Sequence, residues 1–262
     1  MNRAMINFSV VTVTYNAESV IERTVGSVLA QTYSNIEHLI IDGTSSDKTL
    51  SLVNDYMRCS YAAQNKHQIK IVSEPDKGLY DAMNKGIRMA TGDYIVFLNA
   101  GDTFPSEHTL EVIAKCVAEG EKLPGVLYGD TDIVDDKGHF LCHRRLSPPK
   151  SLTWRSFKRG MLVCHQAFYV RTDIAKNNLY DLNYCYSADV DWCIRVMKEA
   201  EKKGLSLLYV NAVIVNFLDG GMTTKNHRAS LKERFQVMRK HYGLLTTLVM
   251  HGWFLLRSFL QK

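Results

Sequence analysis

Apolar residues in the first hundred positions follow two spacings. Short runs rich in apolar and β-branched residues are typical of buried strands and occur at 8–14, 36–41, 69–72 and 94–98. Between these runs, apolar residues three or four positions apart predict helices at 18–30, after 44–47 and at 79–90. Strands that alternate with helices indicate the α/β class, with a mostly parallel central sheet flanked by helices.

The pattern is less regular after residue 102. Helices are expected at 106–118, 189–203, 228–242 and 244–260, and strands at 126–128, 166–170 and 205–217. The polar sequence at 135–138, which ends in glycine, predicts the turn of a hairpin. We therefore expect one domain over 1–222, with halves 1–102 and 103–222, and a C-terminal helical extension over 223–262.

Charge is distributed unevenly along the chain, whose formal net charge is +5. Residues 1–220 contain 24 basic and 26 acidic residues, whereas residues 221–262 contain 8 basic residues and one acidic residue, Glu233. A hydrophobic fraction of 46% with only 5 prolines excludes a disordered or fibrous chain. Six cysteines without a CxxC pair indicate free thiols in a reducing compartment rather than zinc ligands.

Polar residues follow three of the predicted strands, at 15–18, 42–47 and 99–102. In parallel sheets, ligands bind beyond the carboxyl ends of the strands, so these segments are the candidate site. No glycine-rich turn follows the first strand, and the chain contains no GxxxxGK[ST] sequence. Dinucleotide-binding enzymes and P-loop NTPases are therefore disfavoured.

Four segments in succession resemble the signatures of family 2 glycosyltransferases. They are FSVVTVTYN (8–16), LIIDGTSSDKT (39–49), DKGLYDAMNKG (76–86) and ATGDYIVFLNAGD (90–102). The resemblance implies the GT-A fold and an inverting transfer of a sugar from a nucleotide-diphosphate sugar, most simply a UDP-sugar, to a hydroxyl group. It is strongest to the bacterial branch that assembles O-antigen, capsule or exopolysaccharide.

The resemblance also implies a donor pocket, in which Asp42 accepts a hydrogen bond from the nucleotide base. A turn aspartate before Gly43 is the alternative for Asp42, and a surface helix face is the alternative for Asn84. The implied donor-binding residues are Thr14, Tyr15, Glu18, Asp42, Asn84, Asn99 and Asp102.

The metal motif of the family is represented here by residues 99–102, of which only Asp102 is acidic. By resemblance, Asp102 is the direct ligand of Mg²⁺ or Mn²⁺, with diphosphate oxygens and water as the other ligands. The ion would neutralise the charge that develops on the leaving diphosphate. A simple turn aspartate after Gly101 is the alternative.

The catalytic base is assigned, again by resemblance, to Asp189 in the segment 187–192. A carboxylate at a helix N-terminus is stabilised in its ionised form and can accept a proton. A plain N-cap is the alternative; Asp191, two residues on, is expected to point elsewhere and is kept as an acceptor-side candidate ranked below Asp189. His165 and Gln166 resemble a pair near the acceptor, and residues 220–223 resemble a glycine-rich loop near the donor phosphates.

The acceptor is expected to be a glycan or a polyprenyl-pyrophosphate-linked glycan. Between Lys137 and Thr172 the chain has no acidic residue, and Trp154 and Phe157 lie among its basic residues. Arginine recognises phosphate well, whereas nucleic acid is disfavoured because no binding module accompanies the pattern. A solvated basic loop is the alternative.

The C-terminal segment 244–260 is apolar but has 17 residues and contains Arg257. A membrane-spanning helix needs about 20 mostly apolar residues, so we expect this segment to lie on an anionic membrane surface. Packing on the catalytic domain or in a dimer is the alternative. No cleavage site follows the first apolar run, so the interpretation is a cytoplasmic protein, peripheral on the inner membrane face.

Two other function classes remain open. A sugar-phosphate nucleotidyltransferase would need a glycine-rich basic loop after the first strand, which residues 15–18 do not provide. A non-catalytic nucleotide-sugar-binding module is compatible with the single acid in residues 99–102.

Overall fold

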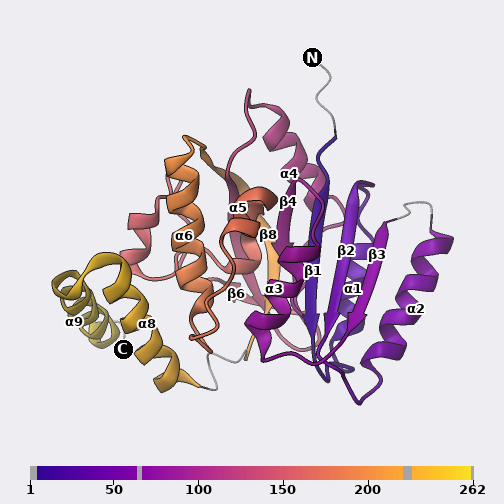
Figure 1. The fold of residues 1–262 in the computed structure, drawn as a ribbon, viewed down its shortest axis with the longest axis horizontal. Helices are drawn as coiled ribbons and strands as arrows, with labels where there is room; N and C mark the ends of the chain where they lie inside the picture. Colours follow the sequence, from indigo (N-terminus) through magenta and orange to yellow (C-terminus); the bar gives the residue numbers. More distant parts are fainter. Residues whose placement is uncertain (1–4, 64–66, 221–225, 261–262) are drawn as a thin grey trace.

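The computed structural model describes residues 5–63, 67–220 and 226–260. Within these ranges the centre is an eight-stranded sheet in the order β3-β2-β1-β4-β7-β5-β6, with β8 paired to β5 (Figure 1). The predicted parallel half is confirmed, because β1 pairs in parallel with β2 and β4, and β2 with β3. Its strands are β1 (Phe8–Thr14), β2 (Ile36–Asp42), β3 (Gln68–Ser73) and β4 (Tyr94–Phe97).

The second half of the sheet is mixed. The antiparallel strand β7 joins β4 to β5, and β8 runs parallel to β5. The predicted turn at 135–138 is confirmed, since it connects β5 to the antiparallel strand β6 and contains Gly138 at φ 88°. These strands are β5 (Val126–Val134), β6 (Phe140–His143), β7 (Phe168–Arg171) and β8 (Leu207–Leu218).

Helices occur close to the predicted positions. The prediction of a strand from Gln166 is wrong, because residues 165–167 form a short 3₁₀ turn and β7 begins at Phe168. The helices are α1 (Ile21–Leu29), α2 (Thr49–Ala62), α3 (Leu79–Met89), α4 (Thr109–Ala118), α5 (Thr172–Asn177), α6 (Ala188–Lys202), α8 (His227–Tyr242) and α9 (Leu244–Leu260), with 3₁₀ helices η1 (Trp154–Arg159) and η2 (His165–Ala167).

Apolar packing fixes the helices against the sheet. A cluster of buried side chains from α1, α2 and β2 includes Ile21, Ile40 and Val53. On α3, Gly86 permits close contact with β1, because a side chain at that position would overlap Val11. These contacts hold the carboxyl ends of the parallel strands, where the candidate site lies, in a rigid frame.

Helix α6 is anchored to α3 through stacked aromatic rings. Trp192 is fully buried, and its ring lies 4.8 Å from that of Tyr180, which in turn stacks on Tyr80 at 5.3 Å. The inward positions predicted for α6, Val190 and Ile194 among them, are buried as expected. This packing fixes the N-terminal end of α6, which carries Asp189.

The C-terminal helices α8 and α9 lie beyond α6, at the end of the molecule opposite α2 (Figure 1). Tyr242 at the end of α8 stacks on Trp154 of η1 with ring centroids 5.7 Å apart. None of the helices in the described ranges has both the length and the apolar character needed to cross a bilayer. The expected domain boundary at residue 222 lies outside the described residues. All six cysteines are free thiols.

Candidate active site

A cavity of about 590 Å³ opens at the carboxyl ends of β1 and β4. The start of α3, the turn η2, the N-terminus of α6 and the end of β8 complete its wall. The structure thus gathers residues that are far apart in the sequence at the edge of the sheet where ligand sites form. Among the residues predicted from sequence, those that line the cavity are Thr14, Tyr15, Asn99, Asp102, His165, Gln166 and Asp189.

Asp102 is buried, and both its carboxylate oxygens accept hydrogen bonds from the second half of the chain. The Leu218 N–H donates to Oδ1 at 2.9 Å, and Gln166 Nε2 donates to Oδ2 at 3.0 Å. Burial raises the pKa of Asp102 to about 6, although the Leu218 N–H and the charge of His165 oppose the rise. A buried carboxylate of this kind is stabilised by a nearby cation.

The residues around Asp102 fit a divalent metal bound in part by the substrate. Asn99 also lines the cavity, and its Oδ1 atom is buried without a hydrogen-bond partner in the described part of the chain. Across the described ranges, no three His, Cys, Asp or Glu side chains group closely enough to hold a metal ion by themselves. One carboxylate and one amide oxygen suit a hard cation whose other ligands are phosphate oxygens and water.

Asp189 lies at the start of α6 between two side chains from other elements. His165 Nδ1 lies 3.6 Å from Asp189 Oδ2, and the Tyr80 hydroxyl donates to Oδ1 at 3.3 Å. Burial alone would raise the pKa of Asp189, but His165, the charge of Arg234 and the Val190 N–H together hold that pKa below its ordinary value. Asp189 is therefore ionised at neutral pH and can accept a proton.

His165 connects Asp189 with the end of β4. Asn99 Nδ2 lies 3.4 Å from His165 Nε2, and Nδ1, on the other side of the ring, faces Asp189. The imidazole thereby links a residue beside the candidate metal ligand with the candidate base.

The opposite end of the cavity presents an aromatic ring and polar atoms. Tyr15 is 65% exposed at the cavity wall, and the Thr14 hydroxyl is buried with no hydrogen-bond partner in the described part of the chain. Asp76 also lines this end. Its Oδ1 accepts a hydrogen bond from the N–H of Gly78, which has φ 107°. A ring, a hydroxyl and a carboxylate can together contact a nucleoside.

Two expected donor-binding residues, Glu18 and Asp42, are not among the residues that line the cavity, and their role in donor binding stays a prediction. Glu18 is exposed, and its carboxylate accepts the Lys48 N–H at 2.9 Å, at the start of α2. Asp42 is buried, and it accepts hydrogen bonds from the hydroxyls of Ser45 and Ser73, at 2.5 and 2.6 Å. Neither side chain lines the cavity. The alternative of a turn aspartate describes Asp42 as the structure places it.

Asn84 and Asp191 also lie away from the cavity. The Asn84 amide exchanges two hydrogen bonds with the backbone of Tyr180, at 3.0 and 2.7 Å, and therefore joins α3 to the segment before α6. Asp191 points towards α8, where Oδ1 lies 2.7 Å from His241 Nε2, and Oδ2 accepts a hydrogen bond from Arg195 at 2.6 Å. Asn84 is therefore engaged by backbone outside the cavity lining, and its donor-binding role stays a prediction. Asp191 points away from Asp189, as expected, so its contacts give no support to it as an acceptor-side residue.

Several residues that line the cavity were missed by the sequence analysis. Asp76 and Tyr80 belong to a segment that resembled a family signature, so that resemblance was the available signal. Tyr186 precedes α6 and Leu218 ends β8, and neither lies in a segment that carried the resemblance. Of the glycine-rich segment 220–223, Gly220 lines the cavity, whereas 221–223 lie outside the described residues.

Three arginines of the acid-free interval have partners within the chain. This leaves fewer cations for an external phosphate than the sequence alone suggested. The contacts are those of Arg144 with the carbonyls of Leu146, Met161 and Leu162, of Arg155 with Glu201, and of Arg171 with Asp173.

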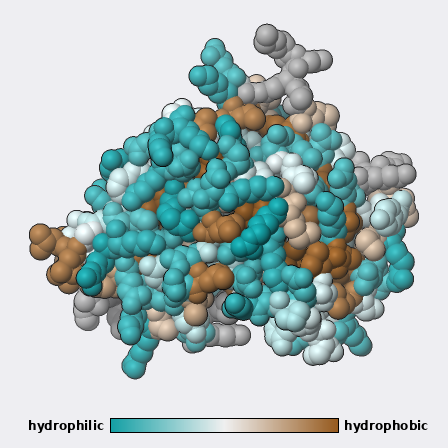
Figure 2. All heavy atoms as spheres, viewed as in Figure 1, coloured by the Kyte–Doolittle hydropathy of each residue, from teal (hydrophilic) through white to brown (hydrophobic). Residues whose placement is uncertain are grey.

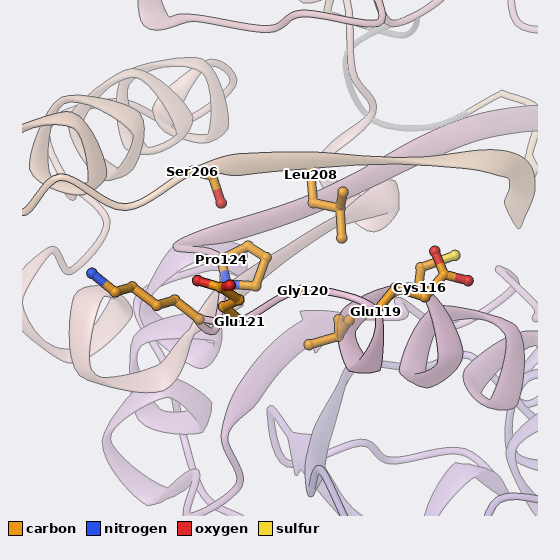
Figure 3. A pocket seen from close by; sticks show the side chains of 9 residues that line it. Cys116, Glu119, Gly120, Glu121, Pro124, Ser206 and Leu208 are labelled. Carbon is orange, nitrogen blue, oxygen red and sulfur yellow. The ribbon is translucent and has the colours of Figure 1, made fainter. Parts of the chain in front are cut away.

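A second hollow of about 630 Å³ lies between the C-terminal end of α4 and the start of β8 (Figure 3). Cys116, Glu119, Pro124 and Leu208 are among its lining residues. It faces the amino ends of β5 and β8, at the opposite edge of the sheet from the first cavity. Its described lining contains none of the residues predicted for the site, so the first cavity is the candidate active site.

Comparison with known proteins agrees with this geometry. The sequence profile described as glycosyl transferase family 2 matches residues 9–177. The PGL/p-HBAD biosynthesis glycosyltransferase of Mycobacterium bovis is 31% identical over 215 residues, which cover 82% of this chain and 77% of the relative. The amylovoran biosynthesis glycosyltransferase AmsB of Erwinia amylovora is 28% identical over 221 residues, which cover 81% and 69%.

Solved structures of other glycosyltransferases share the fold. S. aureus TarS 1-349 in complex with UDP-GlcNAc has a TM-score of 0.69 at 18% identity, over 89% of this chain. The mannosyltransferase PcManGT from Pyrobaculum calidifontis, in complex with GDP-Man and Mn²⁺, has a TM-score of 0.63 at 16% identity, over 90% of this chain. The present chain spans 65% and 64% of these two chains. It is thus a member of glycosyltransferase family 2, an enzyme with the GT-A fold.

Proposed function

We propose that this glycosyltransferase transfers a sugar, with inversion, from a nucleotide-diphosphate sugar to a hydroxyl of a glycan or lipid-linked glycan in surface polysaccharide synthesis. The observation that carries the proposal is that Asp102 and Asp189 line one cavity in different electrostatic surroundings. Asp189 has a lowered pKa, as a base needs, whereas the raised pKa of Asp102 marks a carboxylate that gains from a cation.

The reaction is a single displacement at the anomeric carbon. The acceptor O–H bond breaks and its proton passes to an oxygen of Asp189, while the acceptor oxygen bonds to the anomeric carbon. The bond between that carbon and the phosphate oxygen breaks, and its electron pair leaves with the nucleoside diphosphate. His165, 3.6 Å from Asp189, orients the carboxylate and stabilises its charge before the proton arrives.

Asp102 and Asn99 are the residues that would hold Mg²⁺ or Mn²⁺, which would stabilise the charge of the departing diphosphate. Support comes from the unpartnered Asn99 oxygen and from the raised pKa of Asp102. The Mn²⁺ in the PcManGT complex supports the same type of cofactor.

A UDP-sugar is the favoured donor, since TarS, which shares the fold, binds UDP-GlcNAc. The exposed ring of Tyr15 suits a planar base, and Thr14 and Asp76 suit the polar groups of a nucleoside. The similarity to the amylovoran enzyme AmsB supports an acceptor in surface polysaccharide synthesis.

The C-terminal extension is proposed to contact an anionic membrane from the cytoplasmic side. Apolar side chains protrude at the edge of the molecule where α9 lies (Figure 2), and Leu245 and Val249 are 81% and 70% exposed. Exposed basic residues of α8, including Lys232 and Arg239, precede this surface. Apolar side chains next to cationic ones suit the boundary of an anionic bilayer.

The proposed reaction is tested by incubating the full-length enzyme with UDP-, GDP- and dTDP-sugars. Release of the nucleoside diphosphate is measured with Mn²⁺ or EDTA, and with or without a polyprenyl-pyrophosphate-linked glycan. We expect release from one donor class, stimulated by Mn²⁺ and by the acceptor. Absence of both hydrolysis and transfer with every donor would contradict the proposal.

A further inference from the structure

Glu233 is the one acidic residue among residues 221–262, and its carboxylate binds backbone rather than a lysine or arginine side chain. The Cys185 N–H donates to Oε1 at 2.9 Å. The N–H groups of Tyr186 and Ser187 donate to Oε2 at 2.7 and 3.0 Å. One carboxylate of α8 therefore binds three consecutive amides of the segment that leads into α6.

These amides directly precede α6, and Ser187 is its N-cap, without a side-chain capping bond of its own. The N-terminus of a helix carries partial positive charge, so an anionic side chain from a different helix is favourable at this position. Charge-assisted hydrogen bonds of this kind are the stronger ones. The Ser187 hydroxyl also donates to the Ser230 carbonyl of α8, at 3.2 Å.

The same segment forms a wall of the active-site cavity. Cys185 and Tyr186 line the cavity, and Asp189 follows two residues after Ser187. A shift of these amides would move both the wall and the carboxylate that faces the acceptor. Displacements of about 1 Å in a catalytic group can cost a hundredfold in rate.

A second contact fixes α8 against α6. Asp191 in the first turn of α6 pairs with two residues of α8, His241 at 2.7 Å and Lys240 at 3.0 Å. Its side chain is completely buried. The pairs of Asp191 with His241 and Lys240 therefore help to hold α8 at the distance from α6 at which Glu233 can bind the amides of 185–187.

We propose that Glu233 is a positioning residue for sugar transfer: through the amides of 185–187 it holds Asp189 and the adjoining cavity wall in the productive arrangement. Helix α8 is then part of the active site and not merely an attachment for α9. The inference rests on the proposed function, because it assumes that Asp189 takes the acceptor proton.

The experiment compares Glu233→Ala and Glu233→Gln with wild type, using the full chain. Glu37→Gln is the matched control, because Glu37 likewise accepts three hydrogen bonds, from Ser9 and Thr91, but is a fully buried carboxylate at the amino end of β2. Thermal stability, kcat, donor KM and hydrogen exchange of peptides over 183–190 are measured for each variant.

For Glu233→Ala we expect amide exchange at 185–187 to rise about tenfold and kcat to fall about tenfold or more, with donor KM changed by less than about twofold. Glu233→Gln should lie between Ala and wild type, because its one amide oxygen still accepts the N–H groups of Tyr186 and Ser187. Glu37→Gln should lower the melting temperature without changing kcat or exchange at 185–187.

Unchanged exchange at 185–187 would overturn the inference, as would faster exchange with wild-type kcat. A loss of kcat that Glu37→Gln reproduces at equal loss of stability would also overturn it, since the effect would then be general. Exchange requires no donor. A wild type inactive with all nucleotide sugars would contradict the proposed function, while exchange would still show whether Glu233 holds the segment.

Discussion

His165 Nδ1 lies 3.6 Å from Asp189 Oδ2, although the two residues belong to different elements, η2 and α6. The imidazole also meets Asn99 at the end of β4, at 3.4 Å. The proposed base, Asp189, therefore contacts a histidine that itself lies next to Asn99, three residues before the proposed metal ligand Asp102. His165 thus connects the residue proposed to activate the acceptor with the segment proposed to stabilise the leaving group.

Asp189→Asn is expected to bind donor normally and to lower kcat by about 10²- to 10⁴-fold, because an amide cannot take the acceptor proton. Donor affinity is measured by calorimetry and turnover by nucleotide release. Asp173→Asn is the control, since Asp173 pairs with Arg171 and Lys203 at the surface. Normal turnover by Asp189→Asn would remove this residue from the mechanism.

His165→Gln should reduce kcat less than Asp189→Asn does. Glutamine can still donate a hydrogen bond towards Asp189, but it cannot carry the positive charge that helps keep the pKa of that carboxyl low. The pH dependence of kcat distinguishes the two effects. We expect the acid side of the profile to move to higher pH in His165→Gln, and an unmoved profile would contradict this role.

Asp102→Asn is expected to abolish stimulation by Mn²⁺ and to raise stability at neutral pH. The pKa of Asp102 is raised to about 6, so the folded state holds its proton more tightly than the unfolded state, and the ionised carboxylate opposes folding above that pH. The penalty is at most about 3 kcal/mol at pH 7.5.

Thermal melts in EDTA test the Asp102 prediction. The variant should melt several degrees above wild type at pH 7.5, and the difference should shrink as the pH is lowered towards about 3, below the ordinary pKa of 3.8, where the wild-type carboxyl is mostly neutral in both states. Equal melting temperatures at every pH would show that the carboxylate is not destabilised by burial.

The burial of His38 leads us to expect that the free energy of unfolding decreases in acid. It is fully buried between the Thr12 hydroxyl, at 2.9 Å, and the Tyr56 hydroxyl, at 2.8 Å, and burial lowers its pKa to about 3. Because the unfolded state takes up the proton first, stability is complete above about pH 6.5 and falls as the pH drops towards about 3.

The contribution of His38 to that loss is about 2 kcal/mol at pH 5. In urea unfolding, the free energy of unfolding of His38→Gln should change less between pH 5 and pH 8 than that of wild type. We expect the size of this difference to match the contribution above to within about 1 kcal/mol. His143→Gln is the control, because the His143 side chain is 80% exposed. Parallel pH profiles for His38→Gln and wild type would refute the assignment.

The membrane prediction concerns the exposed face of α9. Full-length protein should sediment with vesicles containing phosphatidylglycerol, less with pure phosphatidylcholine, and less again at high salt. Replacing Leu245 and Val249 together with serine should weaken binding by about tenfold or more. Tyr61→Ser, 69% exposed at the far end of the molecule, is the control. Equal binding by the double variant would contradict membrane contact through α9.

Sequence patterns predicted the parallel half of the sheet well, because β1, β2 and β4 are buried along their whole length and are therefore rich in apolar and β-branched residues. Beyond them, β5 extends to Val134 although its sequence alternates with polar residues, since pairing with β8 on one side and β6 on the other stabilises it. That support is not visible in local sequence.

The site residues also fall into those whose position follows from local sequence and those whose position depends on distant contacts. Asp102 and Asn99 directly follow a buried strand, so their position in the cavity follows from the sheet. The contacts of Asn84 were not predictable, because its partner, the backbone of Tyr180, lies 96 residues away in the sequence. Those of Asp42 were not predictable either, because Ser73, which donates a hydrogen bond to its carboxylate, lies 31 residues away. Long-range hydrogen bonds of this kind are not visible in local sequence.

The hydrogen bonds of Asp102 have a kinetic consequence. Its carboxylate accepts hydrogen bonds from the Leu218 N–H at the end of β8 and from Gln166 of η2, the turn that also carries His165. A donor and metal bound at Asp102 would compete for the same carboxylate and so change its bonds to that turn. We therefore expect the donor to bind before the acceptor, with both bound before a product leaves, so that initial-rate plots intersect rather than run parallel.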